Sequence, residues 1–247
     1  MQTIKISLFV FALGLLLSCT PDEGKGGLAS IEGVVMVQNL NSLQENSGSP
    51  YPATDCDVYI SYGNSGLADD KTRTSHNGIY QFSNLTKGDY TVFVYSDDTL
   101  SNAKYPRLTF SQSVSLDSKK DEAKADQFTI YRHMDYDDGN GVAIGNVKEY
   151  ICATVGTLTS IEDSIPSQET SVYLQFENSD EILERYRTDA NGTFTISKLI
   201  PGKYRVYALS EESKIPADPL TASYKHFEIT DKSSTVVIPE ITIKNFK

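Results

Sequence analysis

One stretch of the chain occurs twice. Residues Asp57–Asp98 align with residues Ser171–Glu212 without a gap. The same offset places Asn77-Gly78 on Asn191-Gly192, and it also matches strand aromatics and alternating aliphatic positions. Internal repetition of this kind indicates one small structural unit that is present in two copies. The repeat therefore constrains the fold strongly, although it names no ligand.

The repeated unit has the pattern of a β domain. Val58–Tyr62 alternates along its length, and Tyr90–Tyr95 is rich in β-branched and aromatic residues, as strands are. Asn77-Gly78 stands between two strand-like runs, which predicts a hairpin with a type I′ turn and positive φ at both central residues. Ile31–Val37 is the predicted first strand, and the polar segment Gln38–Ala53 is predicted to be a long loop.

These signals predict an all-β fold with two tandem seven-stranded, Ig-like β-sandwiches. A chain of 247 residues has room for two such domains. The predicted segments are a signal peptide (1–18), a flexible tether (19–29), a first sandwich (30–132), a linker (133–146) and a second sandwich (147–247).

The repeat also resembles a known family, the carboxypeptidase-regulatory-like domain, which is a transthyretin-like sandwich. The resemblance implies domains that are mostly structural or interaction modules, with core positions at the matching aromatic and aliphatic residues. In the first copy the matching residues are Thr74, Asn77, Gly78, Tyr80, Phe82, Leu85, Gly88, Tyr90 and Val92. In the second copy they are Thr188, Asn191, Gly192, Phe194, Ile196, Leu199, Gly202, Tyr204 and Val206.

The N-terminus has the features of an export signal. An apolar run from Leu8 to Leu17 is too short to span a bilayer, but it suits a signal peptide. Residues 16–19 resemble the lipobox of bacterial lipoproteins, which implies that Cys19 carries the lipid anchor. An ordinary secretory signal with an incidental cysteine is the alternative.

The residues after Cys19 bear on the location of the protein. Thr20 replaces the aspartate that retains proteobacterial lipoproteins at the inner membrane, and Asp22-Glu23 is similar to the acidic export signal of Bacteroidetes surface lipoproteins. We therefore expect a lipid-anchored outer-membrane protein that faces the cell surface, with a periplasm-facing orientation as the alternative.

Charge and cysteine content narrow the function further. The formal net charge is −11 and no dense basic run is present, which argues against nucleic acid as a partner. Cys56 and Cys152 form an even pair in an exported chain, so they are either a disulfide between the two copies or two separate thiols.

An acidic segment between the copies offers oxygen ligands. Asp135, Asp137, Asp138 and Asn140 suit the hard cation Ca²⁺, but their spacing departs from the EF-hand pattern. A metal site and a solvated linker are both open interpretations, and no other cofactor is expected.

No catalytic motif is present in the sequence. The three histidines lack metal-ligand spacing, and nucleophile-elbow, P-loop and HExxH motifs are absent. Hydroxyisourate hydrolase, an enzymatic lineage among transthyretin-like proteins, has a C-terminal tyrosine motif that this chain lacks. The prediction is therefore a non-enzymatic lipoprotein that acts as a spacer and protein-interaction module, with an outer-membrane protein as its partner.

The alternative function is that of a glycan-binding accessory lipoprotein of a polysaccharide-uptake system. Tryptophan is absent, so the candidate sugar-stacking residues in or near loops are Tyr51, Tyr62 and Tyr105. The loops expected to carry recognition are Gln38–Ala53, Leu100–Pro106 and Ile215–Leu220. Positions kept in both copies are attributed to the fold, and function is expected where the copies differ.

Overall fold

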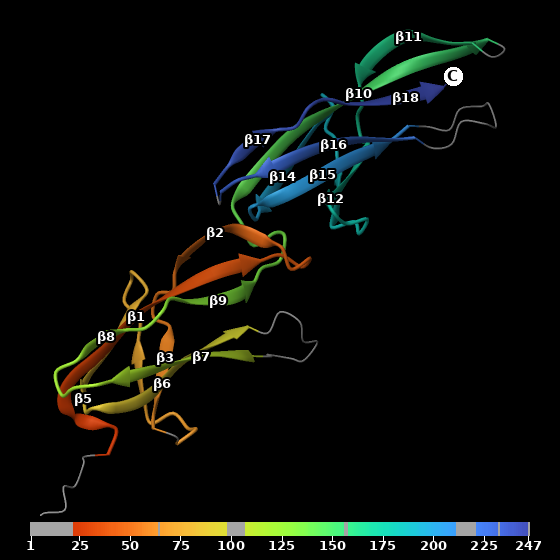
Figure 1. Cartoon of the computed structure of the whole chain (residues 1–247). Coiled ribbons are helices and arrows are strands. Elements are labelled where there is room, and N and C mark those ends of the chain that lie inside the picture. The colour runs from red at the N-terminus through yellow and green to blue at the C-terminus, as the bar shows by residue number, and fades with distance from the viewer. Residues whose placement is uncertain are drawn as a thin grey trace, which may run out of the picture. The chain divides into compact units, whose positions relative to one another are not determined.

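The structure is a computed structural model that describes residues 22–63, 65–97, 107–155, 158–210, 221–231 and 233–246. All regular secondary structure in these ranges is β-strand, in eighteen strands (Figure 1). The predicted all-β sandwich class is confirmed. None of the described segments forms an apolar helix of membrane-spanning length.

The first half of the chain forms two sheets. A five-stranded sheet is built around β1 in the order β2-β1-β5, with β8 and β9 also pairing with β1, and a four-stranded sheet has the order β4-β3-β6-β7. This half has nine described strands where seven were expected. They are β1 (Lys25–Leu40), β2 (Asn46–Pro52), β3 (Asp57–Tyr62), β4 (Asp70–Arg73), β5 (Ile79–Leu85), β6 (Gly88–Asp97), β7 (Arg107–Leu116), β8 (Glu122–Lys124) and β9 (Phe128–His133).

The second half repeats this arrangement with its own strands. Its five-stranded sheet has the order β11-β10-β14, with β17 and β18 also pairing with β10, and its four-stranded sheet has the order β13-β12-β15-β16. The sequence repeat is thus accompanied by a repeat of strand order. The strands are β10 (Gly141–Val155), β11 (Leu158–Pro166), β12 (Ser171–Phe176), β13 (Glu184–Arg187), β14 (Thr193–Leu199), β15 (Gly202–Leu209), β16 (Ala222–Ile229), β17 (Thr235–Val237) and β18 (Ile241–Phe246).

Contacts divide the chain into two compact units. The first unit comprises the chain up to Met36 together with Pro52–Tyr95 and Leu108–Phe128. The second comprises Val37–Tyr51, Ser96–Arg107 and Thr129–Lys247. The predicted domain boundaries differ from this division and stay predictions. Two strands begin earlier than expected, because β1 starts inside the predicted tether and β10 starts inside the predicted linker.

The predicted long loop at Gln38–Ala53 is wrong. β1 continues to Leu40, the chain turns at Asn41, and β2 returns beside β1. The Asn41 Oδ1 atom accepts hydrogen bonds from the backbone N–H groups of Leu43 and Glu45, both at 2.9 Å, and this closes the turn. The hairpin was missed because a polar edge strand carries no apolar alternation.

The Asn-Gly turn is also different from the prediction. Gly78 has a φ of 75°, but Asn77 is not among the residues with positive φ, so the turn is not type I′. The turn joins β4 to β5, which belong to different sheets, so no hairpin is formed. A local turn signal shows where the chain reverses, but it does not determine the sheet that the next strand joins.

Gly78 is nevertheless required at this turn. Its carbonyl oxygen accepts a hydrogen bond from Val35 N at 2.8 Å, and a Cβ atom would lie 2.4 Å from the Val35 oxygen. Gly192 repeats this arrangement against Val147, with a φ of 74° and a Cβ clash at 2.5 Å. Glycine is therefore required in both halves for two reasons: φ is positive, and another backbone segment lies where a Cβ atom would be.

The predicted core positions are confirmed by burial. Side chains that point between the sheets are almost completely inaccessible, including the aromatic residues of the family pattern. Tyr90 and Tyr204 donate hydrogen bonds from their hydroxyl groups to the carbonyl oxygens four residues earlier, Thr86 at 2.8 Å and Ile200 at 2.9 Å. The hydroxyl ends of these buried rings are therefore satisfied by the backbone.

Candidate functional site

The outer face of the β4-β3-β6-β7 sheet carries a cluster of aromatic side chains. Along β3 and β6 the aliphatic residues are buried, and the intervening aromatic residues point away from the core. The ring of Tyr59 stacks on Phe93 at 5.4 Å and meets Tyr95 edge-on at 5.3 Å, while Phe93 and Tyr95 are 5.9 Å apart. We call these three residues the aromatic cluster.

An open groove of about 540 Å³ lies beside the aromatic cluster. Phe93 and Tyr95 form part of its lining, and hydroxyl-bearing and small residues form the rest. Among the described residues, no charged side chain contributes to the lining, although the chain carries a net charge of −11. The lining residues are Ser61, Gly63, Gly66, Leu67, Ala68, Thr91, Phe93, Tyr95, Thr109 and Ser111.

The matching face of the second half differs in character. An aromatic row is kept, with Tyr173 stacked on Tyr207 at 5.0 Å and Tyr207 at 5.0 Å from Tyr224. Charge replaces the neutral lining, because the Arg205 guanidinium lies 5.2 Å from the Tyr224 ring centre and pairs with Asp180. The neutral groove is therefore a property of the first half and not of the repeat.

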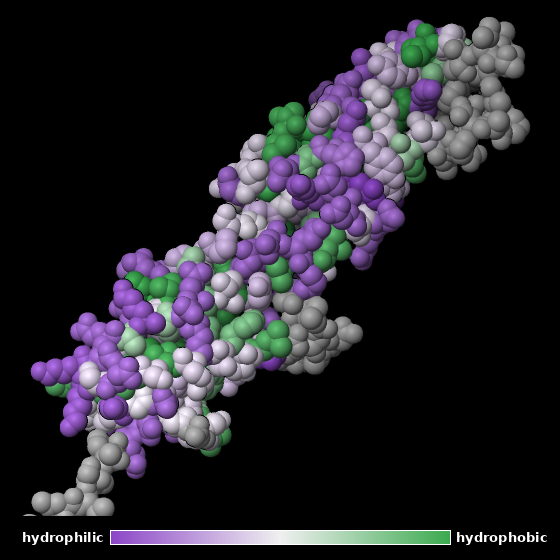
Figure 2. All heavy atoms as spheres, in the orientation of Figure 1, coloured by the Kyte–Doolittle hydropathy of each residue, from purple (hydrophilic) through white to green (hydrophobic). Residues whose placement is uncertain are grey.

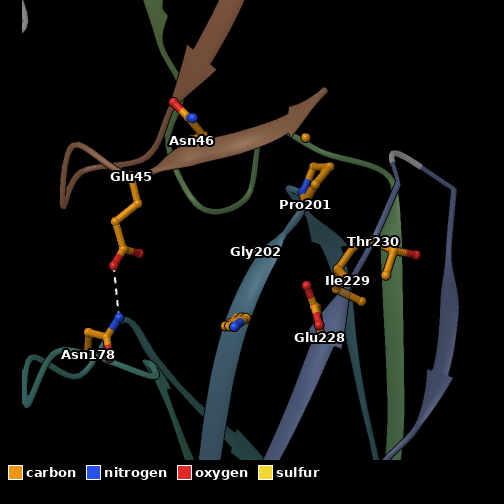
Figure 3. Close-up of a pocket in the computed structure, with 10 residues that line it drawn as sticks. Glu45, Asn46, Asn178, Pro201, Gly202, Glu228, Ile229 and Thr230 are labelled. Atoms are coloured by element: carbon orange, nitrogen blue, oxygen red, sulfur yellow. Dashed lines mark hydrogen bonds between the residues drawn. The ribbon is translucent and has the colours of Figure 1, made fainter. Parts of the chain in front are cut away.

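A second cleft, of about 430 Å³, lies within the second compact unit (Figure 3). The turn after β1 contributes Glu45, whose Oε1 atom accepts a hydrogen bond from Asn178 Nδ2 at 2.8 Å. Lys203 and Glu228 add opposite charges to its lining, which contains no histidine or cysteine. The cleft is polar, and its lining offers hydrogen bonds and charges of both signs.

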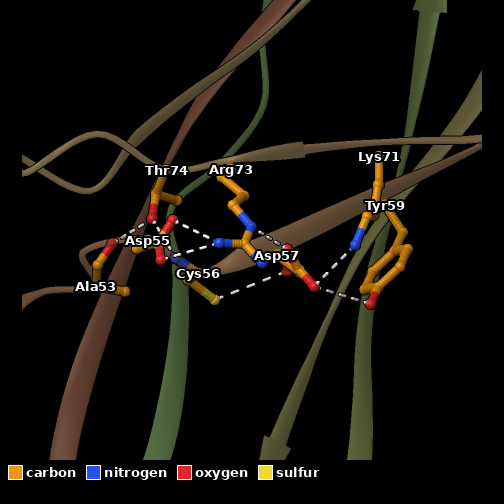
Figure 4. Close-up of polar contacts among 8 residues, drawn as sticks. All are labelled: Ala53, Asp55, Cys56, Asp57, Tyr59, Lys71, Arg73 and Thr74. Carbon is orange, nitrogen blue, oxygen red and sulfur yellow. Dashed lines mark hydrogen bonds and ion pairs between the residues drawn. The ribbon is translucent and has the colours of Figure 1, made fainter.

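An exposed ion-pair cluster surrounds Asp57 (Figure 4). Asp57 accepts hydrogen bonds from Lys71 Nζ at 3.2 Å and from Arg73 Nε at 2.8 Å, and Arg73 also contacts both carboxylate oxygens of Asp55 at 3.0 Å. The bond from Lys71 and the nearby Arg73 hold the pKa of Asp57 below its usual value. Because Asp55, Lys71 and Arg73 are exposed and Asp57 is only half-buried, the cluster contributes little to stability.

The two predicted cysteines lie in different compact units. Cys56 is half-buried and its sulfur lies 3.7 Å from the Asp57 carbonyl oxygen. Cys152 is buried in β10, with its sulfur 3.6 Å from the Tyr150 carbonyl oxygen. Each sulfur lies near a backbone carbonyl oxygen of its own segment, and the choice between a disulfide and two separate thiols stays a prediction.

Two of the predicted calcium ligands, Asp135 and Asp138, bond to each other in a turn. Asp138 Oδ2 accepts the backbone N–H of Asp135 at 3.0 Å, and Asp138 N donates to the Asp135 carbonyl oxygen at 3.1 Å. Over the described part of the chain, no three His, Cys, Asp or Glu side chains gather as metal ligands do. Asp135 and Asp138 thus form one turn, and metal binding by Asp135, Asp137, Asp138 and Asn140 stays a prediction.

Several predicted sites lie outside the described residues. These are Cys19, Tyr105 and the loops Leu100–Pro106 and Ile215–Leu220. Tyr51 and Tyr62 are described, and each contacts another residue. Tyr51 donates a hydrogen bond to Asn39 Oδ1 at 3.1 Å, and Tyr62 packs edge-on against Tyr90 at 5.8 Å.

Sequence reasoning missed the aromatic cluster, although a signal for it exists. Tyr59 and Phe93 correspond to Tyr173 and Tyr207 in the repeat, and all four alternate with buried aliphatic residues. Alternation places them on the face opposite to the core. Aromatic residues kept in both copies are therefore not all core residues.

Comparisons with known proteins agree with the fold. A family model described as the BOS complex subunit NOMO1-like, second beta sandwich domain, matches residues 153–240, which is less than half of the chain. No curated protein matches the sequence significantly.

Three solved structures illustrate the structural similarity. The Bacillus anthracis TIE protein is 14% identical over 90% of this chain with a TM-score of 0.29, and this chain covers only 34% of its length. GBS52, the minor pilin of Streptococcus agalactiae, is 15% identical over 89% of this chain and 96% of its own, with a TM-score of 0.26. A DUF3823 family protein from Bacteroides uniformis is 10% identical over 83% of this chain and 99% of its own, with a TM-score of 0.24. Similarities at this level carry no argument about function.

Proposed function

We propose that this protein is a non-enzymatic binding module of the bacterial cell surface, anchored in the outer membrane by a lipid on Cys19. Its β-sandwiches act as a spacer and present an interaction face to an outer-membrane protein, of which it is an accessory subunit. The observation that carries the proposal is the aromatic cluster of Tyr59, Phe93 and Tyr95 on an outer sheet face. Aromatic side chains are enriched at protein interfaces and dominate their binding energy.

The chemistry of the described clefts supports binding rather than catalysis. Neither lining contains a histidine or a cysteine, and neither contains a set of metal ligands. The groove beside the aromatic cluster has no charged group that could transfer a proton. Its residues can stack and form hydrogen bonds, which is sufficient for recognition.

The lipid anchor is supported by the sequence around Cys19 and by the start of β1. Lys25, where β1 begins, is six positions after Cys19, and six peptide steps span at most roughly 20 Å. A lipid on Cys19 would therefore hold the first sheet near the membrane surface. Within the predicted tether (19–29), Gly24 N donates to the Tyr90 hydroxyl at 3.1 Å.

Lipidation is tested by labelling the expressed protein with a radioactive fatty acid. The wild type is expected to take up label and to partition with outer membranes, and Cys19→Ala is expected to lose both properties. Protease treatment of intact cells then reports the orientation, because a surface-facing protein is digested while a periplasm-facing one is protected. Label retained by Cys19→Ala would contradict the anchor.

Partner binding is tested by chemical crosslinking in native membranes followed by purification. We expect one outer-membrane protein to co-purify with the wild type and to be lost from the double variant Phe93→Ala/Tyr95→Ala. Tyr207→Ala, on the matching face of the second half, is the control. Recovery of the same proteins with the double variant would show that the aromatic cluster is not the interface.

The second candidate, a glycan-binding accessory lipoprotein, is favoured by a different observation. The groove lining combines aromatic and hydroxyl groups without any charge. These are the groups that contact the apolar faces and hydroxyl groups of sugars.

A further inference from the structure

The groove in the first half exists because one residue on β7 is small. Ser115 Oγ donates to Asp89 Oδ1 at 2.6 Å, so counting in twos along the antiparallel strands β6 and β7 places Ser111 beside Phe93. In the second half, Tyr224 is paired with Tyr207, the counterpart of Phe93. A serine in the first half thus stands where the second half has a tyrosine, and it leaves one side of the Phe93 ring uncovered.

The polar groups around the groove have one property in common. Ser61, Thr91, Thr109 and Ser111 are hydroxyl residues, and a hydroxyl group both donates and accepts hydrogen bonds. In the second half, the counterparts of Ser61 and Thr91 are Gln175 and Arg205, which bond to each other at 2.9 Å. At these positions the second half has a charged surface whose side chains bond to each other. The first half has a neutral surface with several hydroxyl groups.

The loop on the other side of the groove is held in place by hydrogen bonds. Ser65 Oγ lies 2.8 Å from Ser61 Oγ and donates to Asp69 Oδ2 at 2.7 Å, and Gly63 N donates to the Asp89 carbonyl oxygen at 2.8 Å. These bonds join the loop to both β3 and β6. A groove wall that is fixed before binding reduces the entropy cost of taking up a ligand.

We propose that this groove binds a neutral sugar chain, with sugar rings stacked on Phe93 and Tyr95 and their hydroxyl groups bonded to the threonine and serine side chains. The electron-rich faces of the aromatic rings attract the C–H groups of a sugar ring. The volume of about 540 Å³ lies within the range of small-ligand sites. The absence of charge in the lining disfavours phosphorylated or acidic ligands, and the open shape admits an internal stretch of a polymer.

This inference rests on the proposed role as a binding module and names the ligand class of one face. It is tested by affinity electrophoresis of the full-length protein in gels that contain one neutral polysaccharide each: dextran, laminarin, xylan, mannan or soluble starch. The protein is kept in a zwitterionic detergent without sugar groups, since glucoside detergents would compete for the groove. At least one polysaccharide is expected to retard the wild-type protein.

Two kinds of variant locate the binding. Phe93→Ala and Tyr95→Ala are each expected to weaken binding by about tenfold, which corresponds to the loss of one stacking contact. Ser111→Tyr reproduces the second half and is expected to abolish retardation by filling the groove without removing an aromatic residue. Tyr207→Ala is the matched control and should migrate like the wild type, and thermal unfolding of each variant shows that it is folded.

The opposite results are also defined. No retardation by any of the five polymers, or retardation that Ser111→Tyr leaves unchanged, overturns the sugar site. Capture of a proline-rich peptide by the wild-type groove but not by Ser111→Tyr, without any sugar binding, would assign the groove to a peptide instead. The Ser111→Tyr variant is also crosslinked in native membranes, which separates the sugar site from the proposed interaction role. If this variant loses sugar binding but still crosslinks to the membrane partner, the interaction role is intact.

Discussion

The buried hydroxyl group of Tyr80 allows a test of how much an unbonded polar group in the core lowers the stability of its half. Tyr80 is 1% exposed, and its hydroxyl oxygen finds no hydrogen-bond partner among the described residues. Burial raises the pKa of this phenol well above its usual value. The second half has Phe194 at the corresponding position, which is the same ring without the oxygen.

The two rings occupy equivalent environments. Tyr80 pairs with Gly33 across the sheet and Phe194 pairs with Gly145. A Cβ atom on either glycine would lie within 2.5 Å of the ring's Cζ atom, so each ring lies directly over its glycine. Since a buried hydroxyl group without a partner costs about 1–3 kcal/mol, Tyr80→Phe is expected to stabilise the first half by an amount of that order.

The assay is chemical and thermal unfolding of Tyr80→Phe and of the reverse change, Phe194→Tyr. We expect the first variant to raise its transition by about 4–8 °C per kcal/mol if that half unfolds as a domain of about 60–100 residues. The reverse variant is expected to lose about 1–3 kcal/mol from the other transition. A loss of stability in Tyr80→Phe would show that the hydroxyl group contributes an interaction, and it would refute this reasoning.

Three further predictions concern the repeated framework. The Thr188 hydroxyl bonds to Thr170 N at 2.9 Å and to Ser167 O at 2.6 Å, and Thr188→Val removes both bonds. Denaturant unfolding should show that this variant loses about 2 kcal/mol or more of unfolding free energy. Thr195→Val, at an exposed position, is the control and should change the unfolding free energy by no more than about 0.5 kcal/mol. Gly192→Ala places a Cβ atom 2.5 Å from the Val147 oxygen. Gly66 has a similar φ of 67° but open space around it, so Gly192→Ala should lower the thermal midpoint more than Gly66→Ala does. Equal effects of the two variants would contradict the clash. Burial raises the pKa of Tyr204, so the unfolded chain ionises this phenol near pH ~10 while the folded chain keeps it neutral. Stability should therefore fall as the pH rises above that value, and Tyr204→Phe should reduce the pH dependence of unfolding measured by tyrosine absorbance.

The features that the sequence predicted correctly are those set by local chemistry. Gly78 and Gly192 were recognised as turn residues, and both have positive φ beside a backbone carbonyl group. Tyr90 and Tyr204 were expected in the core, and both are buried. The conformation of a few neighbouring residues determines which residue types fit at such positions. Their pattern can therefore be recognised in a single sequence.

The features that were missed depend on partners far away in the chain. Asn46–Pro52 has no apolar alternation, and its pairing with β1 at the edge of the sheet makes it a strand. The chain after Asn77-Gly78 joins the other sheet, because Ile31–Val34 pairs with β5. Nothing in the turn itself specifies that choice.

By itself, the sequence determined that the chain is all-β, that its strand pattern occurs twice, and which glycines and aromatic residues build each unit. Only the tertiary structure decided the surface. Alternation in the sequence predicts which side chains share a face of a strand. Whether an outward aromatic ring is covered depends on the sheet order and on the neighbouring side chain, which is Ser111 in the first half and Tyr224 in the second. That difference comes from packing across strands that are distant in sequence, and it turns one of two similar faces into a groove.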